Sequence, residues 1–392
     1  MYQRLLKLPE RSFFLFGPRG TGKSVWLQQV LAHASLRIDL LKSGDFLRYK
    51  RDPGLLAREA AALGESEAWI IVDEVQKLPE LLDEVHALLF ESDRYRFALS
   101  GSSARKLKRS EANMLGGRAL SRRMFPLSML ETGADFSLQN ALRYGQLPMS
   151  VTAASEDEKI DFLDAYIETY LREEIQQEAL TRNLDSFYRF LTVAATVNGQ
   201  MLNIANIARE VGVARSTVQG YFSILEDTLL GWYLPAWRKR VKVKEVAHAK
   251  FYLFDCGVQR ALAGLHRDKP SSHETGTLFE TFILNEFRAL NSWLSLGGQF
   301  HYWRTPSGNE VDLIWRRGNR AAGFEIKSSR EWKSSYNKGL TALLQAGEIE
   351  RAFGIYRGER IQKHGEVTVL PWPTAIQMAA DGEFHAGTGT DK

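Results

Sequence analysis

The chain has 392 residues, of which 44% are hydrophobic and 25% are charged, and its 51 Lys and Arg against 47 Asp and Glu give a net charge of +4. These proportions are typical of a globular protein and exclude disordered, collagen-like and coiled-coil chains. The single cysteine excludes an internal disulfide and a cysteine-based zinc site. The length suggests two or three domains. No apolar stretch approaches the roughly 18 residues that span a bilayer, so we expect a cytoplasmic protein with no membrane partner.

Residues 1–150 alternate between short apolar segments and helical patterns. Five segments have the character of strands: Phe13–Phe16, Leu36–Leu41, Trp69–Val72, Arg96–Ser100 and Ala119–Phe125. Short apolar strands separated by helices are typical of a parallel sheet that is covered on both faces. We therefore predict that residues 1–150 form an α/β domain.

A phosphate-binding motif connects the first strand to the first helix. Its eight residues fit G-x-x-x-x-G-K-[ST]: Gly17, Pro18, Arg19, Gly20, Thr21, Gly22, Lys23 and Ser24. Glycines let consecutive N–H groups turn toward phosphate oxygens at a helix N-terminus. Lys23 would reach the β- and γ-phosphates, and the Ser24 hydroxyl would coordinate Mg²⁺. The motif and its context predict ATP and Mg²⁺ as ligands.

Two carboxylates follow the strand Trp69–Val72. Asp73 would hold the Mg²⁺, and Glu74 would act as general base on the attacking water. Ser100, at the end of the next strand, would contact the γ-phosphate or that water, although a turn or a helix cap explains the same hydroxyl equally well. After a phosphate loop, the carboxylate pair favours hydrolysis over simple nucleotide sensing.

An arginine precedes the fifth strand, in Gly116-Gly117-Arg118. Arg118 could stabilise transition-state charge on the nucleotide of a neighbouring subunit, and Arg122 and Arg123 compete for this role. Such a trans-acting arginine would imply a homo-oligomer, for example a hexameric ring or a filament.

Residues 151–240 have helical patterns and include a candidate helix-turn-helix, Ile204–Val218, with its turn at Gly212. In a DNA-binding protein, Arg215, Ser216, Thr217 and Gln219 would lie on the exposed start of the second helix. A winged-helix module that makes only protein contacts explains the same pattern. Two basic clusters, residues 105–109 and 238–244, would suit a nucleic-acid backbone or an ordinary solvated surface.

Residues 241–380 have a mixed pattern that contains several candidate metal ligands. Val311–Trp315 and Gly323–Lys327 predict a hairpin that places Asp312 opposite Glu325 and Lys327, and the predicted helix Gly276–Leu290 adds Glu280. This set resembles the PD-(D/E)xK nuclease core, in which carboxylates such as Asp312 and Glu325 bind Mg²⁺ and a lysine positions the attacking water. As an alternative, alternating charged residues on a strand often indicate only a solvent-exposed face. Residues 381–392 are expected to be disordered.

The chain resembles the bacterial and archaeal AAA-type ATPases that carry a C-terminal domain of unknown function. Four segments together carry this resemblance: FFLFGPRGTGKS, WIIVDEVQKLP, FALSGSSARKL and GGRALSRRMFPLS. Residues 170–175 resemble the helical signature of that family. Its C-terminal signature is resembled by the segments YWRTPSGNEVDLI and GFEIKSS. The resemblance implies an ASCE-type sheet, ATP and Mg²⁺, Ser100 or Ser102 as sensor, and Arg118 as arginine finger. Ser100 replaces the usual threonine, and Gly20-Thr21 replaces Gln-Val, yet no catalytic group is lost.

The favoured interpretation is an ATP-hydrolysing AAA-type protein that acts on DNA through a winged-helix middle and a nuclease-like C-terminal domain. The alternative is an ATP-dependent switch whose C-terminal domain binds a protein partner and cleaves nothing.

Overall fold

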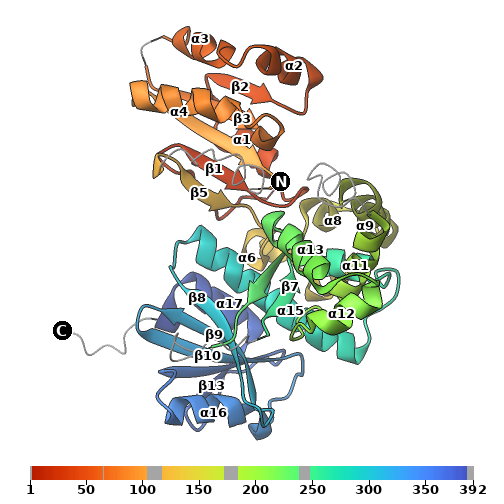
Figure 1. Cartoon of the computed structure of the whole chain (residues 1–392). Helices are drawn as coiled ribbons and strands as arrows, with labels where there is room; N and C mark the ends of the chain where they lie inside the picture. Colours follow the sequence, from red (N-terminus) through yellow and green to blue (C-terminus); the bar gives the residue numbers. More distant parts are fainter. Residues whose placement is uncertain (1, 65, 104–116, 172–183, 238–247, 386–392) are drawn as a thin grey trace, which may run out of the picture. The chain divides into compact units, whose positions relative to one another are not determined.

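The computed structural model describes residues 2–64, 66–103, 117–171, 184–237 and 248–385 (Figure 1). The chain divides into two compact units, Met1–Leu127 with Ile224–Leu230, and Ser128–Ser223 with Gly231–Lys392. The first unit therefore ends before the predicted boundary near residue 150. Helices that follow Leu127 pack inside the second unit, where the backbone N–H of Met129 donates to Glu286 Oε1 at 2.9 Å.

The first unit is built on a five-stranded parallel sheet, in the order β2-β3-β4-β1-β5. Its strands are β1 (Phe13–Phe16), β2 (Leu36–Asp39), β3 (Ala68–Asp73), β4 (Tyr95–Gly101) and β5 (Leu120–Arg123). Its helices are α1 (Lys23–Val30), α2 (Ser43–Arg51), α3 (Leu55–Ala61), the short 3-10 turn Val75–Lys77, and α4 (Leu81–Glu91). Strands β1 and β4 are buried almost throughout, as expected for strands covered on both faces. The predicted α/β class is confirmed.

The second unit begins with helices. They are α6 (Met129–Thr132), the 3-10 turn Gly133–Asp135, α7 (Leu138–Tyr144), α8 (Pro148–Thr152), α9 (Glu156–Ala165), the π-helical Tyr166–Leu171, α11 (Leu184–Thr196), α12 (Ile204–Val211) and α13 (Arg215–Asp227), whose last residues belong to the first unit. A two-stranded antiparallel sheet of β6 (Gly231–Leu234) and β7 (Lys250–Leu253) follows, then α14 (Cys256–Leu262) and α15 (Ser272–Trp293).

The C-terminal sheet has six strands in the order β12-β13-β11-β10-β9-β8. Its elements are β8 (Gln299–Arg304), β9 (Glu310–Arg317), β10 (Arg320–Lys327), the 3-10 turn Ser334–Asn337, α16 (Lys338–Gln345), β11 (Arg351–Tyr356), β12 (Gln362–His364), β13 (Val367–Pro371), α17 (Trp372–Ala380) and the 3-10 turn Glu383–His385. Strands β10, β11 and β13 are parallel, whereas β8, β9 and β12 join antiparallel. A mixed α/β arrangement thus follows the parallel sheet.

Phe384 corrects the predicted disorder after residue 380. Its ring is 2% exposed and lies 4.8 Å from the ring of Phe324 and 4.9 Å from that of Phe353, centroid to centroid. An aromatic side chain gains about 1.5–3 kcal/mol from full burial, which explains why the chain remains ordered up to this point. Residues 386–392 of the predicted tail lie outside the described part of the chain.

Within the described ranges, no helix is both long and apolar enough to cross a bilayer.

Candidate functional site

The phosphate loop runs from the end of β1 into α1 and requires its glycines. Gly20 and Gly22 have φ values of 80° and 91°, in the left-handed region that favours glycine. A Cβ on Gly17 would lie 2.4 Å from the Met124 carbonyl oxygen, so only glycine fits where the loop passes the end of β5. Gly22 caps α1 without a side chain, and the first turn has no acidic residue. The N–H groups of this turn therefore face no side-chain competitor of their own helix, which suits a phosphate.

Lys23 lies within the loop. Its Nζ donates to the carbonyl oxygens of Gly17 at 2.7 Å and Pro18 at 3.2 Å, and the residue is 5% exposed. The ammonium is thus held inside the loop that the motif predicts to bind phosphate.

Arg4 supports the same loop from outside the motif. One guanidinium nitrogen donates to the Thr21 carbonyl at 2.9 Å, and another donates to the Phe125 carbonyl at 2.7 Å. Sequence reasoning missed this residue, because a single arginine near the N-terminus carries no pattern.

The predicted carboxylates lie at the carboxyl end of β3, beside Ser100. The parallel register of β3 and β4 pairs Val72 with Leu99 and so brings the next residues, Asp73 and Ser100, together. The Ser100 hydroxyl donates to Asp73 Oδ1, and the Glu74 backbone N–H donates to Ser100 Oγ at 3.3 Å. Glu74 has a φ of 59°, an uncommon value for a residue with a side chain. Strained backbone of this kind is often found at functional sites.

Gln76 links Glu74 to the second serine of the predicted sensor segment. Its Nε2 donates to Glu74 Oε2 and, at 2.9 Å, to Ser102 Oγ. A Cβ on Gly101 would lie 2.7 Å from Gln76 Oε1, so that glycine makes room for the amide. Gln76 Oε1 is buried with no hydrogen-bond partner among the described residues. Gln76 was not predicted, although it stands only two residues after Glu74.

Arg118 lies at the start of β5 and is exposed. Its guanidinium is 3.3 Å from His86 Nε2 and 5.3 Å from the centre of the Phe90 ring, both on α4. Burial lowers the pKa of Arg123, whereas Arg122 bonds the carbonyl of its neighbour Ser121. The choice of an arginine finger among the three stays a prediction.

The predicted hairpin near the C-terminus is present with longer strands and a shorter turn than expected. Strand β9 continues to Arg317, beyond the predicted end at Trp315, and β10 begins at Arg320, before the predicted start at Gly323, so the turn is the two residues between them. Asp312 Oδ2 accepts from the Ile326 backbone N–H at 2.7 Å and lies 3.3 Å from Lys327 Nζ. Lys327 Nζ is also 2.6 Å from Glu325 Oε1. The structure therefore brings Asp312, Glu325 and Lys327 together.

Glu280, the predicted helix carboxylate, pairs with residues that were not predicted. Its Oε1 accepts from the Tyr252 hydroxyl at 2.5 Å and lies 3.4 Å from Lys250 Nζ. Lys250 Nζ is also 2.6 Å from Glu310 Oε1. Lys250 and Tyr252 both come from β7, about sixty residues before the hairpin, so no local pattern could have pointed to them.

Burial shifts the pKa values of Glu325, Glu280 and Lys327. It raises the pKa of Glu325 well above its usual value, with the Asp312 charge as a further cause, and it also raises the pKa of Glu280. Burial by itself would lower the pKa of Lys327, but Asp312 and Glu325 reverse the effect and hold it above its usual value. Additional positive charge near these carboxylates would favour their ionised forms.

The fit to a divalent cation is limited to two of the predicted carboxylates. Among the described residues, no group of three or more His, Cys, Asp or Glu side chains is arranged to hold a metal ion. Glu325 Oε2 is nevertheless buried without a hydrogen-bond partner. Mg²⁺ is commonly bound by only one or two protein carboxylates together with water. Asp312 and Glu325 are therefore the residues that would hold a single Mg²⁺ or Mn²⁺.

The candidate helix-turn-helix lies on α12 and α13. Gly212 ends α12 with a φ of 75°, and Val218 and Phe222 are fully buried. Arg215, Ser216 and Gln219 are exposed at the start of α13. The basic clusters 105–109 and 238–244 and most of the signature at 170–175 lie outside the described residues, so the winged-helix assignment stays a prediction.

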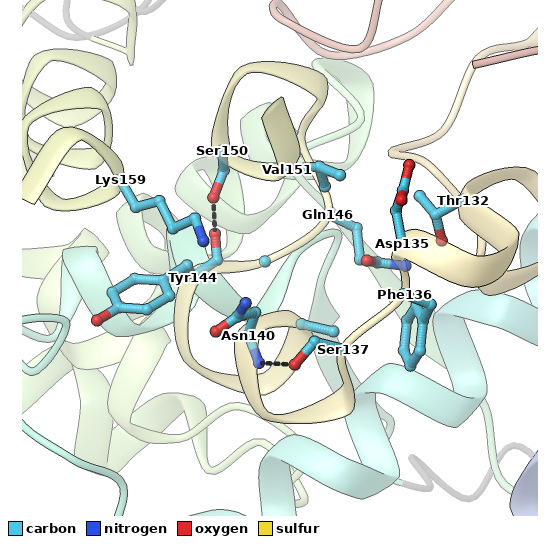
Figure 2. A pocket seen from close by; sticks show the side chains of 12 residues that line it. Thr132, Asp135, Phe136, Ser137, Asn140, Tyr144, Gln146, Ser150, Val151 and Lys159 are labelled. Carbon is cyan, nitrogen blue, oxygen red and sulfur yellow. Dashed lines mark hydrogen bonds between the residues drawn. The ribbon is translucent and has the colours of Figure 1, made fainter. Parts of the chain in front are cut away.

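A small cavity with a mixed polar and apolar lining lies among α7, α8, α9 and the residues that precede α7 (Figure 2). Its volume is about 30 Å³, and it is lined by residues that include Asn140, Gln146, Ser150 and Lys159. Two of its walls are fixed by local bonds, from Ser150 Oγ to the Tyr144 carbonyl and from the Asn140 N–H to Ser137 Oγ. This space suits a water molecule and is far too small for a nucleotide.

Comparison with known protein families divides the chain into three parts. Residues 9–133 match the AAA domain, residues 135–269 match a domain of unknown function (DUF8612), and residues 275–375 match another (DUF4143).

An uncharacterized protein of Mycobacterium tuberculosis (strain ATCC 25618 / H37Rv) is 28% identical over 381 residues, which cover 95% of this chain and 82% of the relative. An uncharacterized protein of Haemophilus influenzae (strain ATCC 51907 / DSM 11121 / KW20 / Rd) is 24% identical over 292 residues, covering 67% and 72%. The Aeropyrum pernix ORC2 protein in its ADP form covers 66% of this chain and 88% of that chain at 11% identity, but its TM-score of 0.32 is too low to support an argument. The family matches support an AAA-type nucleotide-binding domain followed by C-terminal domains of unknown function.

Proposed function

We propose that the chain hydrolyses ATP at the phosphate loop and β3. The observation that carries this proposal is the set of bonds joining Asp73, Glu74 and Ser100 at the end of β3, in a domain that also has an intact phosphate loop. Lys23 and the loop N–H groups bind the β- and γ-phosphates, and Glu74 takes the proton from the attacking water. Ser24 and Asp73 would hold Mg²⁺, which supplies charge neutralisation on the phosphates when it is bound.

The test separates nucleotide binding from hydrolysis. Lys23→Ala should abolish ATP binding, whereas Glu74→Gln should bind ATP with nearly parental affinity and lose at least about a hundredfold in kcat, the scale expected for a general base. Fluorescent-nucleotide titration and phosphate release measure the two effects. Equal hydrolysis by Glu74→Gln and the parent would refute the role of Glu74.

Oligomerisation and Arg118 form a separate part of this proposal. If Arg118 acts in trans, Arg118→Ala mixed with Lys23→Ala should regain hydrolysis that neither protein has alone, because one mixed interface combines an intact loop with an intact arginine. No recovery at concentrations at which the proteins associate would exclude the trans role.

We also propose that the C-terminal carboxylate cluster, defined as Glu280, Glu310, Asp312 and Glu325 with Lys250 and Lys327, cleaves DNA. The unpartnered Glu325 Oε2 beside Asp312 and Lys327 favours this second activity. Asp312 and Glu325 would hold a divalent cation, which supplies Lewis acidity when it is bound. Lys327 orients the attacking water near the phosphodiester, and exposed residues of α13 such as Arg215 contact the DNA backbone.

Cleavage of labelled single-stranded, duplex and branched DNA tests this second proposal. Asp312→Ala and Lys327→Ala should both abolish cleavage. Lys333→Ala should retain it, because Lys333 is an exposed lysine that follows β10. Stimulation of the ATPase by DNA, lost steeply with added salt, would further support DNA as the partner. An absence of cutting by a parent protein that binds DNA would favour the partner-binding switch.

A further inference from the structure

Lys250 is a second buried lysine in the C-terminal carboxylate cluster, and neither the hairpin motif nor the helix carboxylate accounts for it. The residue is only 4% exposed. Its Nζ lies 2.6 Å from Glu310 Oε1 and 3.4 Å from Glu280 Oε1, and 5.5 Å from the centre of the Tyr302 ring. A buried ammonium is stable only when it is paired, so these carboxylates are required to keep Lys250 in place.

The ion pairs divide the cluster into two halves. Lys327 bridges Asp312 and Glu325, whereas Lys250 bridges Glu280 and Glu310. The Tyr252 hydroxyl adds a second donor to the Glu280 oxygen that faces Lys250. Glu280 is thus engaged by two donors, while Glu325 has a buried oxygen without a partner. The half that contains Glu325 is the half that can still accept a ligand.

The charges point to the same division. When all four carboxylates are ionised, they and the two ammonium groups carry a net charge of −2, which one divalent cation balances. Arg304 lies 3.4 Å from Glu310 Oε2, but its side chain is 42% exposed and its charge is screened by water. A second divalent cation would bring the net charge to +2 in a site that is largely removed from water, whereas loss of the Lys250 ammonium would lower this excess to +1 and release two carboxylates as ligands.

We propose that Lys250 is a positioning residue that holds Glu280 and Glu310 away from the metal and so restricts the C-terminal carboxylate cluster to one divalent cation, bound by Asp312 and Glu325. This inference rests on the proposed metal-dependent cleavage. In the absence of Lys250, Glu280 and Glu310 become available as oxygen ligands and the cluster takes a second ion.

The experiment counts Mn²⁺ ions in the whole 392-residue chain without nucleotide. Calorimetry measures the number bound, and electron paramagnetic resonance detects the broadening that two neighbouring Mn²⁺ ions cause. Each protein is compared with the same protein carrying Asp312→Asn, so that ions bound elsewhere cancel. The parent should lose one ion on this change and show no coupled pair. Lys250→Met should show a coupled pair, and Lys333→Met, an exposed control, should match the parent.

A milder substitution keeps the inference open to refutation if Lys250→Met does not fold. Glu280→Gln retains the shape of the side chain, and since Glu280 is not a ligand here, this variant should still bind one Mn²⁺ ion that Asp312→Asn removes, although the lost negative charge weakens Mn²⁺ binding. Loss of the ion in Glu280→Gln, a coupled pair in the parent, or a single ion in folded Lys250→Met would each overturn the inference alone. A parent that binds no ion sensitive to Asp312→Asn would overturn the proposed metal-dependent cleavage as well.

Discussion

Asp255 joins two parts of the second unit, and its removal should be costly. The side chain is 3% exposed. Its Oδ1 accepts from the Val258 N–H at 3.0 Å and so caps α14, while its Oδ2 accepts from the Gln146 N–H at 2.7 Å, in the segment between α7 and α8. The carboxylate packs so closely that a Cβ on Gly145 would lie 1.9 Å from Oδ1. Asp255→Ala would leave both N–H groups without this acceptor.

The expected loss follows from these two bonds. Removing a helix cap costs about 0.5–2 kcal/mol, and a buried N–H left without a partner costs about 1–3 kcal/mol, so the free energy of unfolding should fall by about 1.5–5 kcal/mol. Ser271→Ala is the matched control, because Ser271 caps α15 in an exposed position and should cost only about 1 kcal/mol.

Urea unfolding followed by circular dichroism measures both changes, and hydrogen exchange of the α14 amides assigns the transition to the second unit. If Asp255→Ala costs no more than Ser271→Ala, the reasoning from burial is refuted.

Three further outcomes are expected. Gly17→Ala should weaken ATP binding at least about tenfold, because the added Cβ meets the Met124 carbonyl, while Gly44→Ala, where a Cβ meets nothing within 4 Å, should not; equal affinities would contradict this account of the loop. Gln76→Leu removes both amide bonds and should change kcat for ATP hydrolysis about tenfold with little change in ATP affinity; an unchanged kcat would show that Gln76 does not control Glu74. Burial raises the pKa of Glu286 to about 8, so its protonated form stabilises the fold at a pH below the ordinary glutamate pKa, and this contribution is lost as the pH rises through 8. Glu286→Gln should reduce this decline of the free energy of unfolding with pH, measured by urea titration. Identical pH profiles for the variant and the parent would exclude this role of Glu286.

Local sequence was sufficient wherever a site is made from neighbouring residues. The phosphate loop follows β1, and Asp73 and Glu74 lie at the end of β3. Asp312 and Glu325 lie on β9 and β10, two strands that a short turn joins, and strand periodicity decides which of their side chains share a face. These elements lie where they were predicted. Their chemical roles stay predictions.

Residues that reach a site from a distant element could not be predicted. Lys250 and Tyr252 meet Glu280 only because β7 packs beside α15, and Arg4 meets Thr21 only when the sheet has formed. Each is a single residue without periodicity, so its role depends on tertiary packing. The disorder expected from residue 381 is wrong for residues 381–385 for the same reason, since the buried ring of Phe384 holds this segment in place, and for residues 386–392 it stays a prediction.

The strand order of the first sheet has a consequence for how the chain folds. Strand β1 is made early in the sequence, yet its neighbours are β4 and β5, and Phe13 pairs with Ala98 and Leu120. Parallel pairing over such sequence separation requires large loops to close before any contact is gained, which slows folding. The apolar segment Phe13–Phe16 therefore remains without its partners while much of the unit is synthesised, and it is exposed to aggregation during that time.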